Sequence, residues 1–266
     1  MSVPLFSIIM PCLNEVAHIS EALESVLAQD YGDWELIVAD GGSTDGTPET
    51  LNSYEPRFGG RMTWYREHDA GIYDAMNRAL DRAAGEYVGF LGADDRLRPG
   101  ALTAVANALV RAPRSDIVCG ATHVFGPNAE WDEPARVKIR RGLAQRAPAG
   151  HQSTFVRRQA IKAIGGFDQR FRIAADYDLY LRLVEAGGTE RLLEEALSEF
   201  RLGGASSRSA WATARDYRDV RIAHKANPIV ENLVMVKSAL AATAFAIWMR
   251  LFHRVPGETR PSGSNR

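Results

Sequence analysis

Short apolar runs alternate with helical segments through the first hundred residues, and this alternation constrains the fold more than any other feature. Each apolar run suits a buried strand, and the segments between them carry turn residues or apolar residues at helical spacing. The expected strands cover residues 6–10, 34–39, 62–65 and 86–91, and the clearest helices cover 17–27 and 72–83. This order predicts an α/β protein whose central sheet is mostly parallel and flanked by helices.

The second half of the chain predicts a continuation of this sheet and no separate domain. Short strands are expected at 117–125, 136–139 and 151–156, and helices near 158–164, 174–186, 208–226 and 229–252. The composition from Pro256 onward is typical of a disordered tail. We therefore expect one α/β domain over residues 1–207, a helical extension over 208–255 and a tail over 256–266.

Composition narrows the function classes. The chain has 266 residues, of which 45% are hydrophobic and 24% charged, as in soluble globular proteins. A net charge of -1 disfavours a nucleic-acid partner, which would require a basic surface. Cys12 and Cys119 form no CxxC pair, so neither a disulfide framework nor a structural zinc site is expected. The N-terminus lacks the pattern of a signal peptide, which predicts a cytoplasmic location.

Residues 229–252 combine a wide apolar stripe with a basic end. The charge-free stretch, 238–249, has 12 residues, fewer than the roughly 20 that a membrane span needs. Arg250, His253 and Arg254 would suit a helix lying on an anionic membrane surface. Packing on the core or in a dimer explains the stripe equally well. Peripheral contact with the inner face of the cytoplasmic membrane and an oligomer therefore both stay open.

Carboxylates follow two of the expected strands. Asp40 begins an Asp- and Gly-rich segment after the second strand, and Asp94 and Asp95 follow the fourth. Ligands of parallel α/β sheets bind beyond the carboxyl ends of the strands, where these residues lie. Two adjacent carboxylates suit a Mg²⁺ or Mn²⁺ ion that also contacts substrate phosphates. A solvated acidic turn is the plainer explanation of the same pair.

Three further segments carry polar residues that suit a ligand pocket. Tyr73 and Asn77 share one face of a helix at i and i+4, and His151-Gln152 opens an expected strand. Asp176 lies near the start of a helix, where a carboxylate also complements the helix dipole. Helix capping and structural hydrogen bonds explain each of these residues when it is considered alone.

In combination and in this order, the segments resemble the family-2 glycosyltransferases of the GT-A fold. The resemblance extends over about residues 5–207, and it is closest to transferases that glycosylate envelope lipids and polysaccharide precursors. It implies a Rossmann-like, mostly parallel sheet with C-terminal helices. The matching segments are Pro11-Cys12-Leu13-Asn14-Glu15, 40–47 (DGGSTDGT), 71–77 (GIYDAMN), 90–95 (FLGADD), 151–153 (HQS), 165–168 (GGFD) and 175–179 (ADYDL).

The resemblance implies a nucleotide-sugar donor, with uridine diphosphate as the usual nucleotide. In that case Pro11 and Leu13 line the base and Glu15 lies beside the ribose. Asp40 accepts a hydrogen bond from the base. Asp94 lies near the ribose, and Asp95 binds the Mn²⁺ or Mg²⁺ ion on the diphosphate.

The resemblance also implies that Asp176 is the general base that deprotonates an acceptor hydroxyl. One base opposite the leaving group implies a single displacement with inversion. Ala175 stands where the family has a Glu, and Gly92 where an acid is often found. These departures leave a second possibility, a catalytically decayed subunit that only binds a nucleotide sugar. A sugar-phosphate nucleotidyltransferase is disfavoured, because residues 11–15 (PCLNE) replace the Gly-rich basic loop that it would carry.

Overall fold

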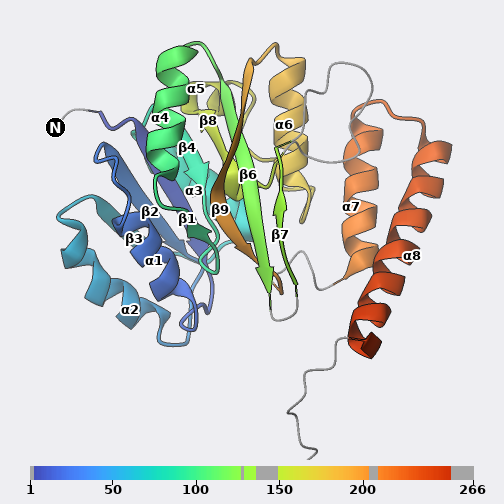
Figure 1. The fold of residues 1–266 in the computed structure, drawn as a ribbon, viewed down its shortest axis with the longest axis horizontal. Helices are drawn as coiled ribbons and strands as arrows, with labels where there is room; N and C mark the ends of the chain where they lie inside the picture. The colour runs from blue at the N-terminus through green and yellow to red at the C-terminus, as the bar shows by residue number, and fades with distance from the viewer. Residues whose placement is uncertain (1–2, 127–128, 136–148, 204–208, 253–266) are drawn as a thin grey trace, which may run out of the picture.

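The first half of the chain forms a parallel sheet with β1 at its centre. The computed structural model describes residues 3–126, 129–135, 149–203 and 209–252. Within them β1 pairs in parallel with β2 and β4, and β2 pairs in parallel with β3 (Figure 1). These four strands confirm the predicted parallel sheet. Their bounds are β1 (Phe6–Cys12), β2 (Trp34–Asp40), β3 (Met62–Arg66) and β4 (Tyr87–Phe90).

The second half extends the same sheet with mostly antiparallel strands. The strand order is β3-β2-β1-β4-β8-β6-β9-β5, and β7 pairs with β6 outside this path. The expected strand at 136–139 lies outside the described residues. The added strands are β5 (Arg96–Leu97), β6 (Ile117–Gly126), β7 (Ala129–Glu133), β8 (Thr154–Arg157) and β9 (Glu190–Arg201).

The strand predicted at 151–156 is wrong in its first half. His151–Ser153 form a 3₁₀ turn, η2, and strand β8 begins at Thr154. The amide of Ser153 and the Oγ1 hydroxyl of Thr154 both donate to the carbonyl of Gly150, at 3.0 Å each. Side-chain hydrogen bonds of this kind stabilise a turn in place of an extended ladder.

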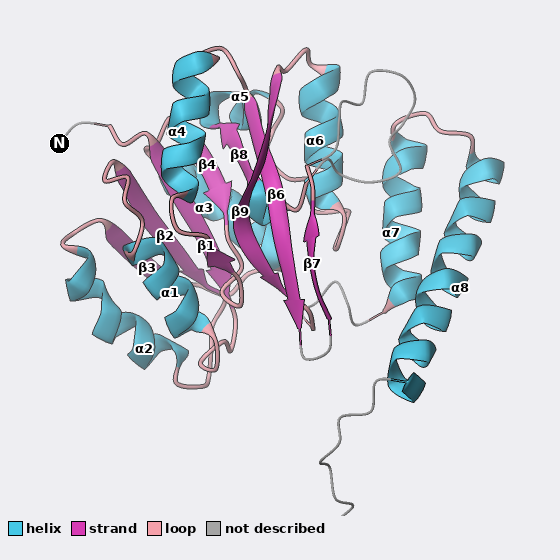
Figure 2. Ribbon diagram, in the orientation of Figure 1, coloured by secondary structure: helices cyan, strands magenta, loops and turns pink. Residues whose placement is uncertain are grey.

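Helices cover both faces of the sheet (Figure 2). Along β1, Phe6, Ile8 and Met10 pack with helices α1, α2 and α4, whereas Ile9 packs with α3, α5 and α6. This alternation is that of a strand buried on both faces. The helices are α1 (Ile19–Leu27), α2 (Thr47–Tyr54), α3 (Ile72–Arg82), α4 (Ala101–Arg111), α5 (Arg158–Ala163) and α6 (Ala175–Glu185), with a 3₁₀ segment η1 (Glu55–Phe58).

Two long helices follow the sheet and pack against each other beside α6. They are α7 (Ala210–Ala223) and α8 (Pro228–Phe252), at the end of the molecule away from α1 and α2 in Figure 1. A buried ion pair, with Arg221 Nε 2.5 Å from Glu231 Oε2, joins them. No helix in the described part of the chain is long and apolar enough to cross a membrane. The tail predicted at 256–266 lies outside the described residues.

Candidate active site

The loops that follow β1 and β2 are tied together by side chains. Asn14 has a left-handed backbone, with φ of 57°, and its amide donates to Ser43 Oγ at 2.8 Å. Its side-chain Oδ1 accepts from the amide of Thr44 at 2.8 Å. The amide of Glu15 donates to Thr47 Oγ1 at 2.9 Å. The two loops are therefore joined by hydrogen bonds at the carboxyl edge of the sheet.

Asp40 is the last residue of β2, next to these two loops, and one of its carboxylate oxygens has no hydrogen-bond partner among the described residues. The residue is 1% exposed, and its Oδ1 accepts from the amide and the hydroxyl of Ser43 at 2.9 and 2.5 Å. Its Oδ2 makes no hydrogen bond to the described residues, since Arg66 Nε lies 3.6 Å away. A buried oxygen of this kind is costly unless a ligand donor satisfies it.

Of the other residues assigned to the nucleotide, Pro11 is buried within β1 and Glu15 is partly buried. The Leu13 side chain is 54% exposed. All three lie on β1 or in the loop that directly follows it, next to the Asp40 loop. Their contacts with a nucleotide stay a prediction.

Asp94 and Asp95 follow β4 and are held in place by Arg201 at the end of β9. The amide of Arg201 donates to Asp95 Oδ1 at 2.9 Å, and its Nε donates to the carbonyl of Asp94 at 3.2 Å. Asp95 is buried, whereas Asp94 is partly exposed. Burial, together with the neighbouring Asp94 carboxylate, raises the pKa of Asp95 to about 7.

The two carboxylates converge beside Gly92, where a cation would fit. A Cβ at Gly92 would lie 2.7 Å from Asp95 Oδ2 and 2.9 Å from Asp94 Oδ1, so both oxygens border the space that the missing side chain leaves. Among the described residues, no three His, Cys, Asp or Glu side chains form a metal cage. Mg²⁺ commonly binds through one or two carboxylates together with substrate phosphates. The donor set fits such an ion.

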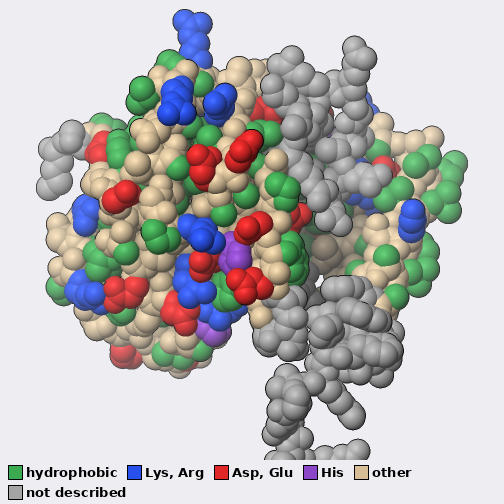
Figure 3. All heavy atoms as spheres, in the orientation of Figure 1, with side chains coloured by type: hydrophobic (Ala, Val, Ile, Leu, Met, Phe, Trp, Pro, Cys, Tyr) green, Lys and Arg blue, Asp and Glu red, His purple; other side chains and the backbone are tan. Residues whose placement is uncertain are grey.

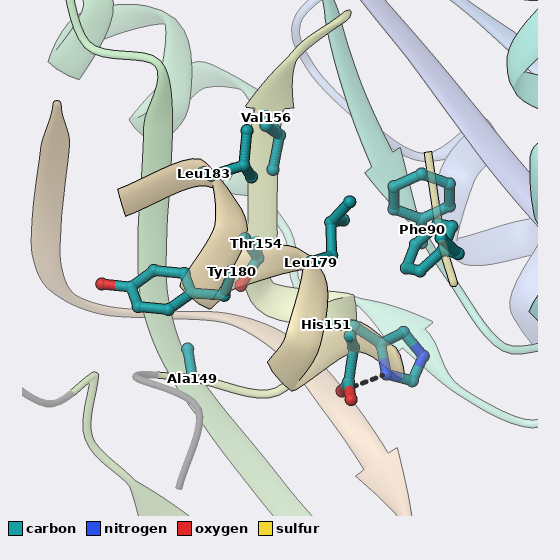
Figure 4. A pocket seen from close by; sticks show the side chains of 10 residues that line it. Phe90, Ala149, His151, Thr154, Val156, Leu179, Tyr180 and Leu183 are labelled. Atoms are coloured by element: carbon teal, nitrogen blue, oxygen red, sulfur yellow. Dashed lines mark ion pairs between the residues drawn. The ribbon is translucent and has the colours of Figure 1, made fainter. Parts of the chain in front are cut away.

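His151 and Asp176 form an ion pair close to the two carboxylates that follow β4. His151 Nδ1 lies 3.5 Å from Asp176 Oδ2. Figure 4 marks this ion pair with a dashed line at the His151 ring. Burial lowers the pKa of His151, but the Asp176 carboxylate, followed by Asp95 and Asp94, more than offsets this effect. The pKa of His151 is therefore raised overall. The structure thus brings the predicted base, the histidine and the acidic pair into one electrostatic unit.

A small apolar cavity of about 30 Å³ lies behind this pair, under α6. Figure 4 shows His151 at its polar end, with Phe90, Val156 and Leu183 among its walls. A cavity of this volume holds about two water molecules, so it is too small for a nucleotide sugar.

Tyr73 and Asn77 come from α3 and bind the backbone of the loop that leads to α6. The Tyr73 hydroxyl donates to the carbonyl of Ile173 at 2.7 Å, and its ring stacks on Phe167. The Asn77 side chain binds both backbone polar groups of Phe167. Its Nδ2 donates to the Phe167 carbonyl at 2.9 Å, and its Oδ1 accepts from the Phe167 amide at 2.8 Å. These groups hold the loop, and their contact with substrate stays a prediction. Gln152 is buried within η2.

Arg201, Arg66 and Asp69 border the site without having been expected there. Arg66 ends β3 at the same sheet edge as Asp40, so the rule for strand ends could have indicated it. Asp69 Oδ2 would lie 2.5 Å from a Cβ at Gly41, which places it against the Gly-rich loop. Arg201 has no local signal, because its partner Asp95 is 106 residues away in the chain.

Intermixed acidic and basic side chains mark the face of the molecule shown in Figure 3. The Nη2 group of Arg201 lies 2.7 Å from Glu21 Oε2 on α1, and Arg96 lies 2.9 Å from Glu199 and 3.3 Å from Glu21. Arg201 therefore contacts both Asp94 and Asp95 in the site and the exposed Glu21 on α1.

Sequence comparison relates the chain to known glycosyltransferases. The chain is 38% identical over 186 residues to the PGL/p-HBAD biosynthesis glycosyltransferase of Mycobacterium bovis, with 68% of this chain and 70% of that protein covered. It is 29% identical over 230 residues to the putative teichuronic acid biosynthesis glycosyltransferase TuaG of Bacillus subtilis, with 83% and 90% covered.

Solved structures share its fold. The mannosyltransferase PcManGT from Pyrobaculum calidifontis, in complex with GDP-Man and Mn²⁺, superposes with a TM-score of 0.68 at 18% identity and covers 96% of this chain and 78% of its own. TarS 1-349 from S. aureus, in complex with UDP-GlcNAc, superposes with a TM-score of 0.66 at 19% identity and covers 94% and 76%. These superpositions confirm the GT-A fold. Residues 7–165 match the sequence model of glycosyl transferase family 2, and with the 38% identity to the mycobacterial relative this match shows that the chain belongs to that family.

Proposed function

We propose that this glycosyltransferase moves a sugar, with inversion, from a uridine diphosphate sugar to a hydroxyl of an envelope lipid or saccharide-linked acceptor. The observation that carries the proposal is the convergence of Asp176 and His151 with Asp94 and Asp95 at one edge of the sheet. A base and a diphosphate site must lie on opposite sides of the reacting sugar for a single displacement. We propose that Asp176 serves as the base and that Asp94 and Asp95 form the diphosphate site.

Asp176 is the proposed base in this displacement. The acceptor oxygen attacks C1 of the donor sugar while the bond between C1 and the diphosphate oxygen breaks. The acceptor proton passes to the Asp176 carboxylate, and the nucleoside diphosphate leaves with the bonding electron pair. His151, 3.5 Å from Asp176, orients that carboxylate.

Asp95 and Asp94 would hold Mn²⁺ or Mg²⁺, which supplies charge stabilisation for the leaving diphosphate when bound. The convergence of both carboxylates beside Gly92 supports this assignment. The presence of Mn²⁺ in the PcManGT complex agrees with it.

Asp40 would recognise the nucleotide base through Oδ2, which makes no hydrogen bond to the described residues and suits an N–H donor such as that of uracil. Pro11, Leu13 and Glu15 would line the base and ribose from the neighbouring loop. The UDP-GlcNAc complex of TarS supports a uridine donor, whereas the GDP-Man complex of PcManGT keeps a guanosine donor within the experiment below.

The acceptor proposal rests on the names of the relatives and on α8. Exposed apolar side chains on α8 lead in the sequence to Arg250, His253 and Arg254. An apolar face followed by basic residues complements an anionic membrane surface. We infer that α8 lies on the inner face of the cytoplasmic membrane, where lipid-linked acceptors are reached.

Thermal unfolding against UDP, GDP, UDP-glucose, UDP-GlcNAc and GDP-Man, each with Mn²⁺ and with a chelator, tests the donor site. A ligand at a hundredfold over Kd adds about 2.7 kcal/mol of stability, so one nucleotide should raise the Tm in a metal-dependent way. The shift should persist in Asp176→Asn and disappear in Asp95→Asn. No shift with any nucleotide would contradict the proposal.

Turnover then tests the base. Release of nucleoside diphosphate from the stabilising donor should fall about 10²-fold or more in Asp176→Asn, because a positioned base contributes at least that factor. Normal turnover in Asp176→Asn would refute its assignment as the base. Nucleotide binding with no turnover in the wild-type protein would favour a decayed binding subunit instead.

A further inference from the structure

Helix α6, which carries Asp176, begins without a cap of its own. Its N-cap residue is Ala174, followed by Ala175, and neither has a side-chain oxygen. The first amides of a helix need acceptors that the helix itself cannot provide. A Ser, Asp or Asn at the N-cap would normally accept from these amides, whereas this sequence has alanines there. Within the first turn, Asp176 Oδ1 accepts from the amide of Tyr177 at 2.8 Å.

Asp216, from α7, binds the backbone that leads into α6. Its Oδ2 accepts from the amide of Ile173 at 2.6 Å and from the amide of Ala174 at 2.8 Å. The negative carboxylate also lies at the positive end of the α6 dipole, which favours both hydrogen bonds. The two amides belong to the residues that lead into α6, two and three positions before Asp176.

The same peptide segment is held from the other side by α3. The Tyr73 hydroxyl donates to the carbonyl of Ile173 at 2.7 Å, so the amide and the carbonyl of Ile173 are both engaged. Both partners come from segments far away in the sequence. The backbone before Asp176 is therefore clamped between α3 and α7.

Helix α7 continues along α6 beyond this clamp. The ring of Tyr217 stacks on Tyr177, with centroids 5.4 Å apart. His224 Nε2 lies 2.9 Å from Asp178 Oδ1, and Asp178 is buried. These contacts fix the rotation of α6 about its axis, which decides where the Asp176 side chain points.

We propose that Asp216 is a positioning residue for the reaction and that α7 is part of the machinery that aligns the base. Asp216 acts through the backbone, because both of its hydrogen bonds to the α6 entry go to main-chain amides. The proposal rests on the proposed function, in which Asp176 is the base. It assigns a catalytic purpose to a helix outside residues 7–165, which match the family.

The test compares Asp216→Ala with Asp216→Asn. Alanine removes the acceptor, whereas asparagine keeps one oxygen that can reach both amides without the charge. Val220→Ala is the control for stability, because Val220 is fully buried on the same helix and its apolar side chain accepts no hydrogen bond from the α6 entry. Asp219→Asn is the control for charge, because Asp219 pairs with Arg218 on the same helix.

Two measurements are made on all four variants. The first is amide hydrogen exchange at Ile173 and Ala174, which needs no substrate. The second is nucleoside diphosphate release from UDP-glucose, UDP-GlcNAc and GDP-Man with Mn²⁺, resolved into kcat and donor KM. In Asp216→Ala we expect exchange to accelerate and kcat to fall about tenfold or more, because small misplacements of a reacting group cost that much. Donor KM should change less than about twofold, and Asp216→Asn should recover part of kcat.

The outcomes are separable. If Asp216→Ala keeps the exchange rates and the kcat of Val220→Ala, the positioning role is wrong. If Asp216→Ala does not fold, Asp216→Leu decides, because leucine fills a similar volume without an acceptor. A kcat and exchange within about twofold of wild type in that variant would likewise overturn the proposal. Normal turnover in Asp176→Asn would instead refute the base. Accelerated exchange in Asp216→Ala would then still show the clamp on the α6 entry.

Discussion

At the scale of single residues, the site depends on a missing side chain as much as on the acidic groups present. The resemblance to the family leads us to expect an acid at the position of Gly92, and its absence suggests a weakened site when only the sequence is considered. The structure gives another reason for the glycine, because Asp94 Oδ1 and Asp95 Oδ2 both occupy the space beside it. A side chain at this position would displace the two carboxylates.

Substitution of Gly92 by alanine should therefore weaken metal binding while leaving the fold intact. The added Cβ would lie under 3.0 Å from both carboxylate oxygens, so at least one of them must move. We expect the Mn²⁺ concentration for half-maximal thermal stabilisation in the presence of UDP to rise about tenfold or more. Gly32→Ala is the matched control, because a Cβ there meets nothing within 4 Å. Equal Mn²⁺ dependence in both variants would contradict the proposed metal site.

At the scale of secondary-structure elements, α8 presents an apolar face that the described structure leaves exposed. The side chains of this face, between 40% and 74% exposed, are Ile229, Val230, Leu233, Val236 and Leu240. The other side of the helix packs on α7 through the buried Arg221–Glu231 pair. Within residues 228–244 of α8, where the exposure of the side chains is described, Lys237 is the one exposed cation, so apolar contact dominates this face.

A charge on this face should abolish membrane binding. We expect the protein to sediment with vesicles that contain phosphatidylglycerol, and Leu233→Glu combined with Leu240→Glu to remain in the supernatant, because buried charge is costly in the interface. Val110→Glu on α4 is the control, since Val110 is 81% exposed elsewhere. Light scattering tests the alternative. If the wild-type protein is a dimer and the double variant is a monomer, this face of α8 is a subunit interface.

At the scale of the whole molecule, the acidic site makes stability depend on pH. The pKa of Asp95 is about 7 in the folded protein, against an ordinary value of 3.8. Between these values the folded state holds a proton that the unfolded state has released, so the free energy of unfolding falls as pH rises. The raised pKa of His151 acts in the same direction, since its protonated form is favoured in the folded state.

The metal-free protein should therefore lose stability from pH 4 to pH 7 through Asp95. At 1.36 kcal/mol per pKa unit the loss is on the order of 4 kcal/mol. Urea denaturation with a chelator at several pH values measures it, and Asp95→Asn should show a clearly flatter profile. Mn²⁺ with UDP should restore wild-type stability at pH 7.5, where the carboxylate is ionised. Identical pH profiles for the wild type and Asp95→Asn would mean that Asp95 does not carry the effect.

Local patterns in the sequence predicted the parallel half of the sheet and the position of most helices. Apolar runs locate β1 to β4, and helical periodicity locates α1, α3, α5, α6 and α7 within three residues at each end. Parallel strands share one carboxyl edge, so the sequence alone predicts that the strand-end carboxylates Asp40, Asp94 and Asp95 lie along the same edge. The family likeness of the motifs added Asp176.

Only the tertiary structure decided how these residues are held. Residues 190–201 form β9 although their pattern does not predict a strand, because the ladder to β6 compensates for exposed Glu194 and Glu195. Arg201 meets Asp95, and Asp216 meets Ile173, through hydrogen bonds between segments far apart in the chain. Tyr73 and Asn77 likewise bind a distant loop. Such pairings leave no periodic signal in the sequence, since each one depends on where the folded sheet and helices bring the two partners.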